Sequence, residues 1–416
     1  MLRSRQIVGP AAALLSVLAI LLPLLTAQDW PQWRGPNRDG ALPAFADPGI
    51  WPDQLKLKWR VKVGIGYSTP LLVNKRIYVL ARQGDTETAS CLDFDSGRQI
   101  WRDAYAAPYT MNPAARAHGM GPKSTPLYHA GKIFTLGISG ILSGYDAASG
   151  KLSWRREFSA EFKNTSPLFG TATSPIAERG LVIAHVGGHD GGALTAFDAE
   201  TGRTVWAWTG DGPAYASPIL VTLEGIRQIV TQSQKQIVGV SAADGKLLWS
   251  IPFTTAYVQN IITPILFRDT LIVSGLDRGV TAFRLAQSGG RWRAEKVWEN
   301  PAASFYMSNP VINNQILFGM SHKNRGQFVA LDAATGKTLW TTAGREGENA
   351  ALLSGGDKLF ILTDSAELTV AKASGTAFEP LRRYTVASSS TWANPLLSGK
   401  CFLVRDAESL TLWSID

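Results

Sequence analysis

One short turn recurs along this chain and limits what the chain can fold into. Its copies all end in tryptophan: CLDFDSGRQIW at Trp101, GYDAASGKLSW at Trp154, AFDAETGRTVW at Trp206, GVSAADGKLLW at Trp249 and LDAATGKTLW at Trp340. An enzyme needs one reactive constellation, whereas a solenoid or propeller needs the same turn in every repeat. The motif is therefore predicted to be architectural.

Each copy of the turn belongs to a longer unit. The units open with Thr, Ser or Asn followed by proline, as in TPLLVNKRIYVL and SPIAERGLVIAH, and six of these prolines are 43 to 56 residues apart. Each unit can be divided into four short apolar strands separated by Gly, Asp and Asn turns. This period is close to the roughly 40–45 residues of a propeller blade.

The number of copies predicts the number of blades. Five copies are clear, two are degenerate and end at Trp298 and Tyr384, and the last stops at LWSID before its outer strand. LKLKWRVKV, with Trp59, is predicted to supply that missing strand and so to remove an exposed sheet edge. Residues 55–416 are therefore predicted to form an all-β, eight-bladed β-propeller of four-stranded antiparallel blades, closed by an N-terminal strand.

The residue types of the turn have structural roles. The aspartate carboxylate is expected to cap the turn, the glycine to supply a positive φ, and the tryptophan to wedge between neighbouring blades. One copy has Ser241 in place of the aspartate, which suits a turn cap better than a catalytic acid. The residues concerned are Asp146, Asp198 and Asp332, the glycines Gly97, Gly150, Gly202, Gly245 and Gly336, and the five tryptophans of the motif.

The first 27 residues have the pattern of an export signal. Two arginines in MLRSRQ precede the apolar stretch AAALLSVLAILLPLL, and cleavage is expected after Ala27. An uncleaved membrane anchor is the alternative, although Pro10 and Pro23 interrupt the apolar run. No cysteine lies near the cleavage point for a lipid anchor. The mature chain is therefore expected in the periplasm or outside the cell, with no stable membrane span.

Residues 28–54 form an extension before the repeats. Its segment DWPQWRGPNRDG is predicted to lie across the propeller surface with both tryptophans packed down, the alternative being a docking segment for a partner. Cys91 and Cys401 are too few for a disulfide framework; they could pair in an oxidising compartment, but two free thiols are favoured. The net charge of +8 is scattered without a basic run, so nucleic-acid binding is not expected.

A candidate ligand site lies where the segments before the prolines should form one mouth of the central channel. Its aromatic and amide side chains suit a peptide, a sugar or a flat ligand, although they could also simply fill and hydrate the channel. The inserted loop 105–123 adds basic residues, so either an anionic ligand or a solvated lid is possible. The mouth residues are Tyr67, Lys123, Tyr215, Asn260, Tyr306, Asn309, Trp392 and Asn394, and the loop residues are Arg116 and His118.

Other chemistry has little support in the sequence. His185, His189 and Asp190 lie on a strand and a Gly-rich turn, where a spacing of four does not bring two histidines together, so no metal site is expected. The serines lack a G-x-S-x-G elbow, which argues against a serine hydrolase.

The repeats resemble the PQQ-like (pyrroloquinoline-quinone-type) propeller family from about Leu55 to Asp416. The resemblance implies either a quinoprotein dehydrogenase with quinone and calcium on the propeller axis, or a non-catalytic propeller like the lipoprotein of the outer-membrane β-barrel assembly machinery. DWPQWRGPNRDG also resembles the start of exported bacterial PQQ-like repeat proteins. The dehydrogenases have adjacent cysteines and an acidic calcium site, and this chain has neither adjacent cysteines nor an evident acidic cluster.

The expected function is therefore an exported, non-catalytic, monomeric propeller. It would serve as a binding or assembly scaffold for a protein partner or envelope polymer, with no cofactor. One alternative is a divergent PQQ-dependent alcohol or sugar dehydrogenase, with quinone and calcium. The other is a carbohydrate-binding propeller.

Overall fold

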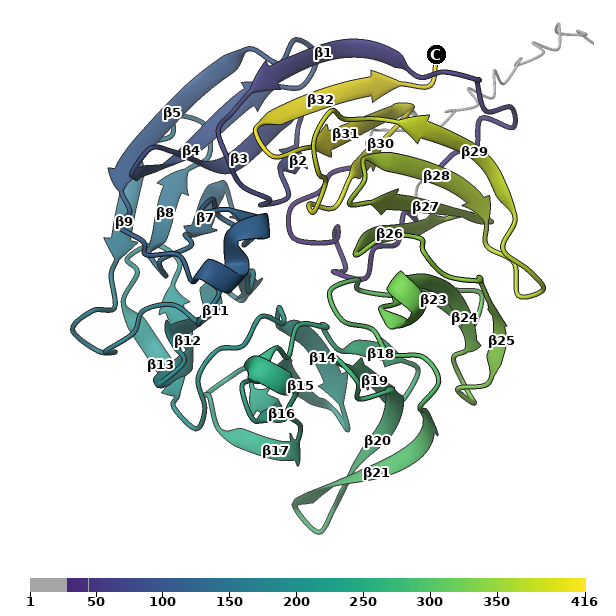
Figure 1. Ribbon diagram of the computed structural model, residues 1–416. Helices are drawn as coiled ribbons and strands as arrows, with labels where there is room; N and C mark the ends of the chain where they lie inside the picture. Colours follow the sequence, from purple (N-terminus) through teal and green to yellow (C-terminus); the bar gives the residue numbers. More distant parts are fainter. Residues whose placement is uncertain (1–27, 44) are drawn as a thin grey trace, which may run out of the picture.

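The computed structural model describes residues 28–43 and 45–416 of the chain. The expected signal peptide lies outside the described residues. The strands β1 to β32 form eight four-stranded antiparallel sheets, which are arranged as blades around one axis (Figure 1). This confirms the predicted eight-bladed propeller. No helix in the described ranges is both long and apolar enough to span a membrane.

Each blade runs from an inner strand to an outer strand in chain order. Blades 1 to 4 are β2 (Leu71–Val73), β3 (Arg76–Gln83), β4 (Thr86–Asp93), β5 (Gln99–Ala106); β6 (Leu127–His129), β7 (Lys132–Leu136), β8 (Leu142–Asp146), β9 (Leu152–Arg156); β10 (Ile176–Glu178), β11 (Leu181–Gly188), β12 (Gly191–Asp198), β13 (Thr204–Trp208); and β14 (Ile219–Leu223), β15 (Ile226–Gln232), β16 (Gln236–Ser241), β17 (Leu247–Pro252).

The second half of the ring repeats this order. Blades 5 to 8 are β18 (Ile265–Phe267), β19 (Thr270–Ser274), β20 (Val280–Ser288), β21 (Arg291–Asn300); β22 (Val311–Asn313), β23 (Ile316–Ser321), β24 (Gln327–Asp332), β25 (Thr338–Thr341); β26 (Ala350–Gly355), β27 (Lys358–Thr363), β28 (Glu367–Lys372), β29 (Pro380–Thr385); and β30 (Leu396–Ser398), β31 (Cys401–Arg405), β32 (Ser409–Ser414), with β1 (Lys56–Lys62) as outer strand.

The ring closes through β1, as predicted. β1 pairs antiparallel with β32 and places Trp59 opposite Leu412. The last blade is thus completed by a strand from the other end of the repeat region, so β32 has a partner on each side. Because these two segments are about 350 residues apart in sequence, their pairing holds the ring shut.

In most repeats the tryptophan joins its blade to the next one. The Trp154 indole Nε1 donates a hydrogen bond to the Ala199 carbonyl at 3.0 Å, and a Cβ atom placed on Gly202 would lie 2.6 Å from the Trp154 ring. The turn therefore needs glycine both for its positive φ of 69° and for the close approach of the ring. The same contact joins Trp59 to Gly97, Trp101 to Gly150, Trp206 to Gly245 and Trp298 to Gly336.

The carboxylate of the repeated turn bonds within its own turn. The Asp198 Oδ1 atom accepts from the Thr201 backbone N–H at 2.8 Å and from its hydroxyl at 2.7 Å. Asp146 and Asp332 make the same pair of bonds to Ser149 and Thr335.

Neither cysteine forms a disulfide. Cys91 is a buried free thiol, and Cys401 is a half-buried free thiol. Burial raises the pKa of Cys91 to about 12, so this thiol stays protonated and behaves as a small core residue.

Candidate functional site

The main cavity is an axial pocket of about 620 Å³ at the channel mouth. This volume is within the range that holds small ligands in proteins. Eight of the ten ligand residues expected from the sequence line it: Tyr67, His118, Lys123, Tyr215, Tyr306, Asn309, Trp392 and Asn394. The repeated architecture brings them together, because each comes from a loop at the same end of its blade or from the inserted loop.

The inserted loop covers one side of the axial pocket. It contains the 3-10 helix η1 (Pro113–His118), which lies at the inner edge of the ring (Figure 1). The Asn112 side chain caps this helix by accepting from the Ala114 N–H at 3.0 Å, and Ala115 is buried. The His118 ring stands edge-on to Trp392 with the centroids 4.4 Å apart, which joins the loop to the segment before blade 8.

Lys123 supplies the positive charge of the axial pocket. Its Nζ donates to the Phe169 carbonyl at 2.7 Å, and no carboxylate in the described ranges lies within ion-pair distance of it. Burial lowers the pKa of Lys123 to about 8. Burial, and then the Lys123 charge, lowers the pKa of His118 to about 4. At neutral pH the ammonium is thus charged and the imidazole neutral.

Amide groups face the axial pocket with their oxygens already bonded to protein. Asn309 Oδ1 accepts from the Thr263 N–H at 2.8 Å, Asn349 Oδ1 accepts from Ser308 at 2.9 Å, and Gln259 Oε1 accepts from the Tyr306 hydroxyl at 2.5 Å. Because each oxygen is held, the corresponding NH₂ group is oriented as a donor. The pocket therefore offers N–H donors beside the Lys123 ammonium.

The floor of the axial pocket comes from the N-terminal extension. Trp33 lines the pocket, and the guanidinium carbons of Arg34 and Arg38 lie 5.4 and 5.5 Å from its ring centroid. Arg34 donates to the Pro310 carbonyl at 2.5 Å, and Arg38 donates to the Ser174 carbonyl at 3.0 Å. The extension thus reaches the axis and bonds to opposite blades, where the sequence suggested only packing across the surface.

Positive charge is concentrated around this floor. Burial lowers the pKa of Arg34 to about 10, and burial together with the neighbouring Arg34 lowers that of Arg38 to about 9. Arg405, with a pKa lowered to about 9 by burial, donates to the Ser68 and Leu80 carbonyls at 2.7 Å. The hydrogen bonds of these guanidinium groups go to oxygens of carbonyl type and not to carboxylates.

Two residues of the expected site lie elsewhere. The Asn260 side chain is buried and donates to the Ser233 carbonyl at 2.7 Å and the Phe253 carbonyl at 3.0 Å, so it fastens the loop that carries Gln259. Arg116 is exposed on the outer side of η1 and does not line the pocket.

The lining also includes residues that had not been expected from the sequence, among them Trp33, Gln259 and Asn349. The repeat unit ALLSGGDKLFILT has no proline at its start, and Asn349 stands just before it, where most other units have Ser or Thr. This departure from the repeat was the only sign of Asn349 in the sequence. Gln259 and Trp33 have no sequence signal of this kind, because their positions depend on loops outside the repeat.

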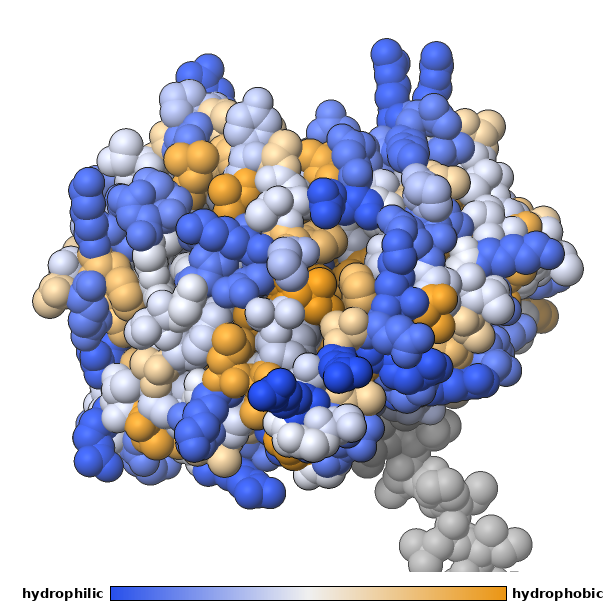
Figure 2. Space-filling view, turned by 90° about the horizontal axis from the view of Figure 1, so that it is seen from below, coloured by the Kyte–Doolittle hydropathy of each residue, from blue (hydrophilic) through white to orange (hydrophobic). Residues whose placement is uncertain are grey.

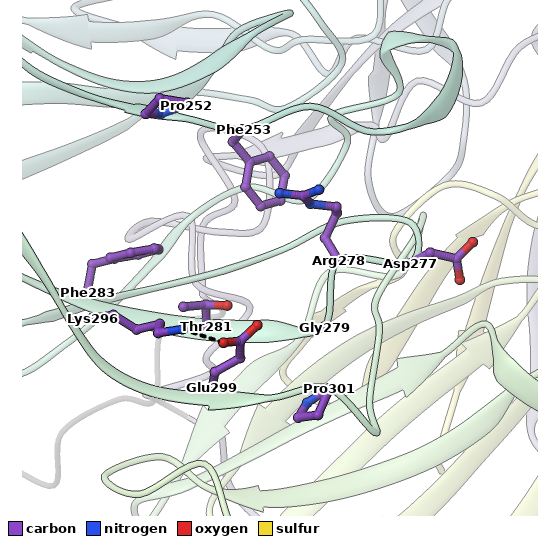
Figure 3. Close-up of a pocket in the computed structure, with 10 residues that line it drawn as sticks. All are labelled: Pro252, Phe253, Asp277, Arg278, Gly279, Thr281, Phe283, Lys296, Glu299 and Pro301. Carbon is purple, nitrogen blue, oxygen red and sulfur yellow. Dashed lines mark hydrogen bonds and ion pairs between the residues drawn. The ribbon is translucent and has the colours of Figure 1, made fainter.

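A second cavity, of about 590 Å³, lies between blades 4 and 5 (Figure 3). The Arg278 guanidinium lies over the Phe253 ring at 5.4 Å, and Lys296 pairs with Glu299 at 2.6 Å. Blade 5 has the long β20–β21 hairpin in place of the repeated turn, so Trp249 of blade 4 bonds to Gln228 of its own blade. This groove therefore marks a missing inter-blade contact. Asp277 at its edge pairs with His322 at 2.9 Å.

The rim of the propeller offers no comparable site on the side shown in Figure 2. Hydrophilic side chains separate small hydrophobic patches there. Several exposed aliphatic residues belong to outer strands of different blades and are scattered singly, as is usual for a protein surface: Ile100, Leu152, Val205, Leu247, Val297 and Leu339.

The lining of the axial pocket does not fit the calcium ion of a quinoprotein dehydrogenase. Calcium takes six to eight oxygen ligands and favours carboxylates. None of the residues that line the pocket is acidic. Within residues 28–43 and 45–416 there is also no group of three or more His, Cys, Asp or Glu side chains placed to hold a metal ion.

The fold defines a PQQ-like propeller, with a cavity at its channel mouth. The chain belongs to the family described as "Outer membrane protein assembly factor BamB", whose model matches residues 85–342. BamB of Burkholderia pseudomallei is 23% identical over 343 residues, which cover 73% of this chain and 84% of that protein. These findings confirm the resemblance inferred from the repeats.

Quinoproteins are also similar to this chain. The quinohemoprotein alcohol dehydrogenase ADH-IIG of Pseudomonas putida is 27% identical over 165 residues, which cover 37% of this chain and only 21% of the dehydrogenase. Among solved structures, BamB from Moraxella catarrhalis has a TM-score of 0.61 at 14% identity and covers 86% of this chain and 97% of its own. A europium-containing methanol dehydrogenase has a TM-score of 0.68 at 13% identity, with 93% and 98% covered. These structural likenesses establish the fold alone.

Proposed function

We propose that this chain is a non-catalytic binding or assembly scaffold of the cell envelope, periplasmic or secreted, that receives its partner at the axial pocket. The observation that carries the proposal is the chemistry of the lining: aromatic rings, oriented amide donors and one ammonium group, with no acidic side chain to act as a base or calcium ligand. Such a lining can bind a ligand, but it does not provide the base or the calcium ligands that oxidation of an alcohol would need. Residues 1–27 would be the leader, 28–54 the extension that forms the pocket floor, and 55–416 the propeller, acting as a monomer.

The family supports this role. The assembly factor BamB of Burkholderia pseudomallei matches 73% of this chain, whereas the alcohol dehydrogenase named above matches 37% of it. A rigid closed ring suits display, because eight blades hold the mouth residues in fixed positions while the inserted loop covers them. The partner would be a protein segment or an envelope polymer that reaches the axis.

Site-specific photo-crosslinking tests the proposal. A benzophenone amino acid placed at Tyr306 in the axial pocket is compared with one at Val205, an exposed rim position on blade 3. In envelope fractions of the source cell, a discrete adduct is expected from position 306 and none from 205. Adducts from the rim position alone would move the binding surface to the outer strands.

The dehydrogenase alternative has its own test. The purified mature chain is titrated with pyrroloquinoline quinone and Ca²⁺ in a calorimeter, and dye-linked oxidation of simple alcohols is followed in parallel. We expect no turnover, because the pocket lining supplies no carboxylate for the metal. Stoichiometric binding with turnover would replace the scaffold by a quinoprotein enzyme.

A further inference from the structure

We propose that the axial pocket binds an acidic saccharide, with the sugar carboxylate on Lys123 and the ring against the aromatic walls. This inference names the ligand of the pocket and therefore rests on the proposed function. It follows from three features, which are the charge of the lining, the incompletely hydrogen-bonded arginines beside Trp33, and the combination of aromatic rings with groups that both donate and accept.

The charge of the axial pocket favours an anion. Lys123 projects from the wall with only a carbonyl as its protein partner, and Arg34 and Arg38 lie directly behind the Trp33 ring. The lining itself contains no acidic residue. Asp406, the nearest carboxylate to Arg405 in sequence, already pairs with Arg60 at 2.8 Å. In a partly desolvated cavity such charges act strongly on a ligand, because little water screens them.

The buried guanidinium groups behind the pocket lining are incompletely hydrogen-bonded. Arg34 is fully buried, and its Nε and Nη1 atoms make no hydrogen bond to any residue in the described ranges, nor does Nε of Arg38. The charge of Asp39 acts on Arg34, so two buried cations share one nearby carboxylate. Buried charges in proteins are usually paired with an opposite charge. A ligand carboxylate above Trp33 would add negative charge near these two groups.

The other lining residues favour a sugar acid over an aromatic acid as the ligand. Trp33, Trp392 and Tyr215 line the pocket with aromatic rings, against which the apolar face of a pyranose ring can pack. Tyrosine hydroxyls and asparagine amides both donate and accept, as the hydroxyl groups of a sugar require. The Tyr67 hydroxyl and the whole Asn394 amide have no side-chain hydrogen bond to the described residues and are free for this purpose. A flat aromatic acid would leave these polar groups unpaired.

The test uses defined sugars and matched variants. Binding of D-galacturonate and D-glucuronate to the mature protein is measured by calorimetry and by tryptophan fluorescence, with D-galactose, D-glucose and benzoate as comparison ligands. We expect at least one uronate to bind at least about tenfold more tightly than its neutral counterpart, the usual effect of one charge-assisted hydrogen bond.

The variants identify Lys123 as the carboxylate ligand. K123M should weaken uronate binding at least about tenfold, and K123R should largely restore it. K132M is the matched control, because Lys132 is a similarly shielded lysine paired with Glu200 outside the pocket, and it should bind as the unaltered protein does. The thermal melting temperature of each variant is compared with that of the unaltered protein to check that the fold is intact. Affinity should also fall as the pH rises through about 8, where Lys123 loses its proton.

Several results would overturn the inference. Equal binding of neutral sugars and uronates, tighter binding of benzoate, or unchanged uronate binding by K123M would each contradict it. No uronate binding at millimolar concentration would also refute it. A crosslinked protein partner at position 306 would then leave the proposed function in place while removing the saccharide, so the two failures are distinguishable.

Discussion

The contact between each tryptophan and the glycine of the next blade predicts a specific stability effect. In G202A the new Cβ would lie 2.6 Å from Trp154 Cδ2 and 2.7 Å from Cε3, and φ is +69°. The left-handed backbone costs about 1–2 kcal/mol for alanine, and overpacking of the indole adds about 1–3 kcal/mol. Displacement of the ring would also weaken the 3.0 Å bond from Trp154 to Ala199, at about 1 kcal/mol. The expected loss of unfolding free energy is about 3–6 kcal/mol.

The same blade provides a control. Gly180 has a similar φ of +78°, but a Cβ atom there would meet nothing within 4 Å, so G180A should cost only the backbone term of about 1–2 kcal/mol. Both variants are compared with the unaltered mature chain by urea unfolding, followed by tryptophan fluorescence and circular dichroism.

The double variant isolates the ring. With W154A in the background, G202A should cost about as much as G180A, because the clash has been removed. If G202A and G180A are equally destabilising in the presence of Trp154, the close packing of the indole on the turn makes no difference to stability, and the inter-blade role assigned to it is wrong.

Three further effects follow from other contacts. In the fourth turn the carboxylate and the hydroxyl have exchanged positions, because Ser241 comes first and Asp244 three residues later. S241D alone should therefore lower the unfolding free energy by about 0.5 kcal/mol, since it places a second carboxylate beside Asp244. The double variant S241D/D244T should restore the stability measured by urea unfolding. Burial lowers the pKa of His185 from 6.5 to about 4, so the unfolded chain binds its proton first and this residue should reduce the unfolding free energy by about 3 kcal/mol between pH 6.5 and 4. Urea midpoints of H185Q over this range should fall less steeply than those of the unaltered chain. R38A should lower the unfolding free energy by about 2 kcal/mol and expose the extension to proteolysis, because the carbonyl groups of Ser174 and Pro175 lose their donor. An unchanged cleavage pattern would show that Arg38 does not hold the extension on the propeller.

Part of the axial pocket could be predicted from the sequence because it follows from the repeat. Tyr67, Tyr215 and Tyr306 each stand a few residues before a repeat proline, and the closed ring brings these positions to one mouth. Asn260 occupies a comparable position before blade 5, yet its side chain turns away to three carbonyl groups of the preceding blade 4. Whether a loop side chain faces the axis or the blade depends on local hydrogen bonds that the period does not specify.

The sequence by itself determined the architecture of this protein. Eight blades could be predicted from the repeated turn, with its aspartate, glycine and tryptophan, and from the spacing of the prolines. The closure of the ring could be predicted from the truncated last copy and the strand around Trp59, which supplies its missing part. These signals are local and repeated, so each copy confirms the others. Only the tertiary structure decided the floor and the charge of the axial pocket. Trp33, Arg34 and Arg38 reach the axis through contacts with blades more than a hundred residues away. Such single, long-range contacts leave no periodic trace in the sequence.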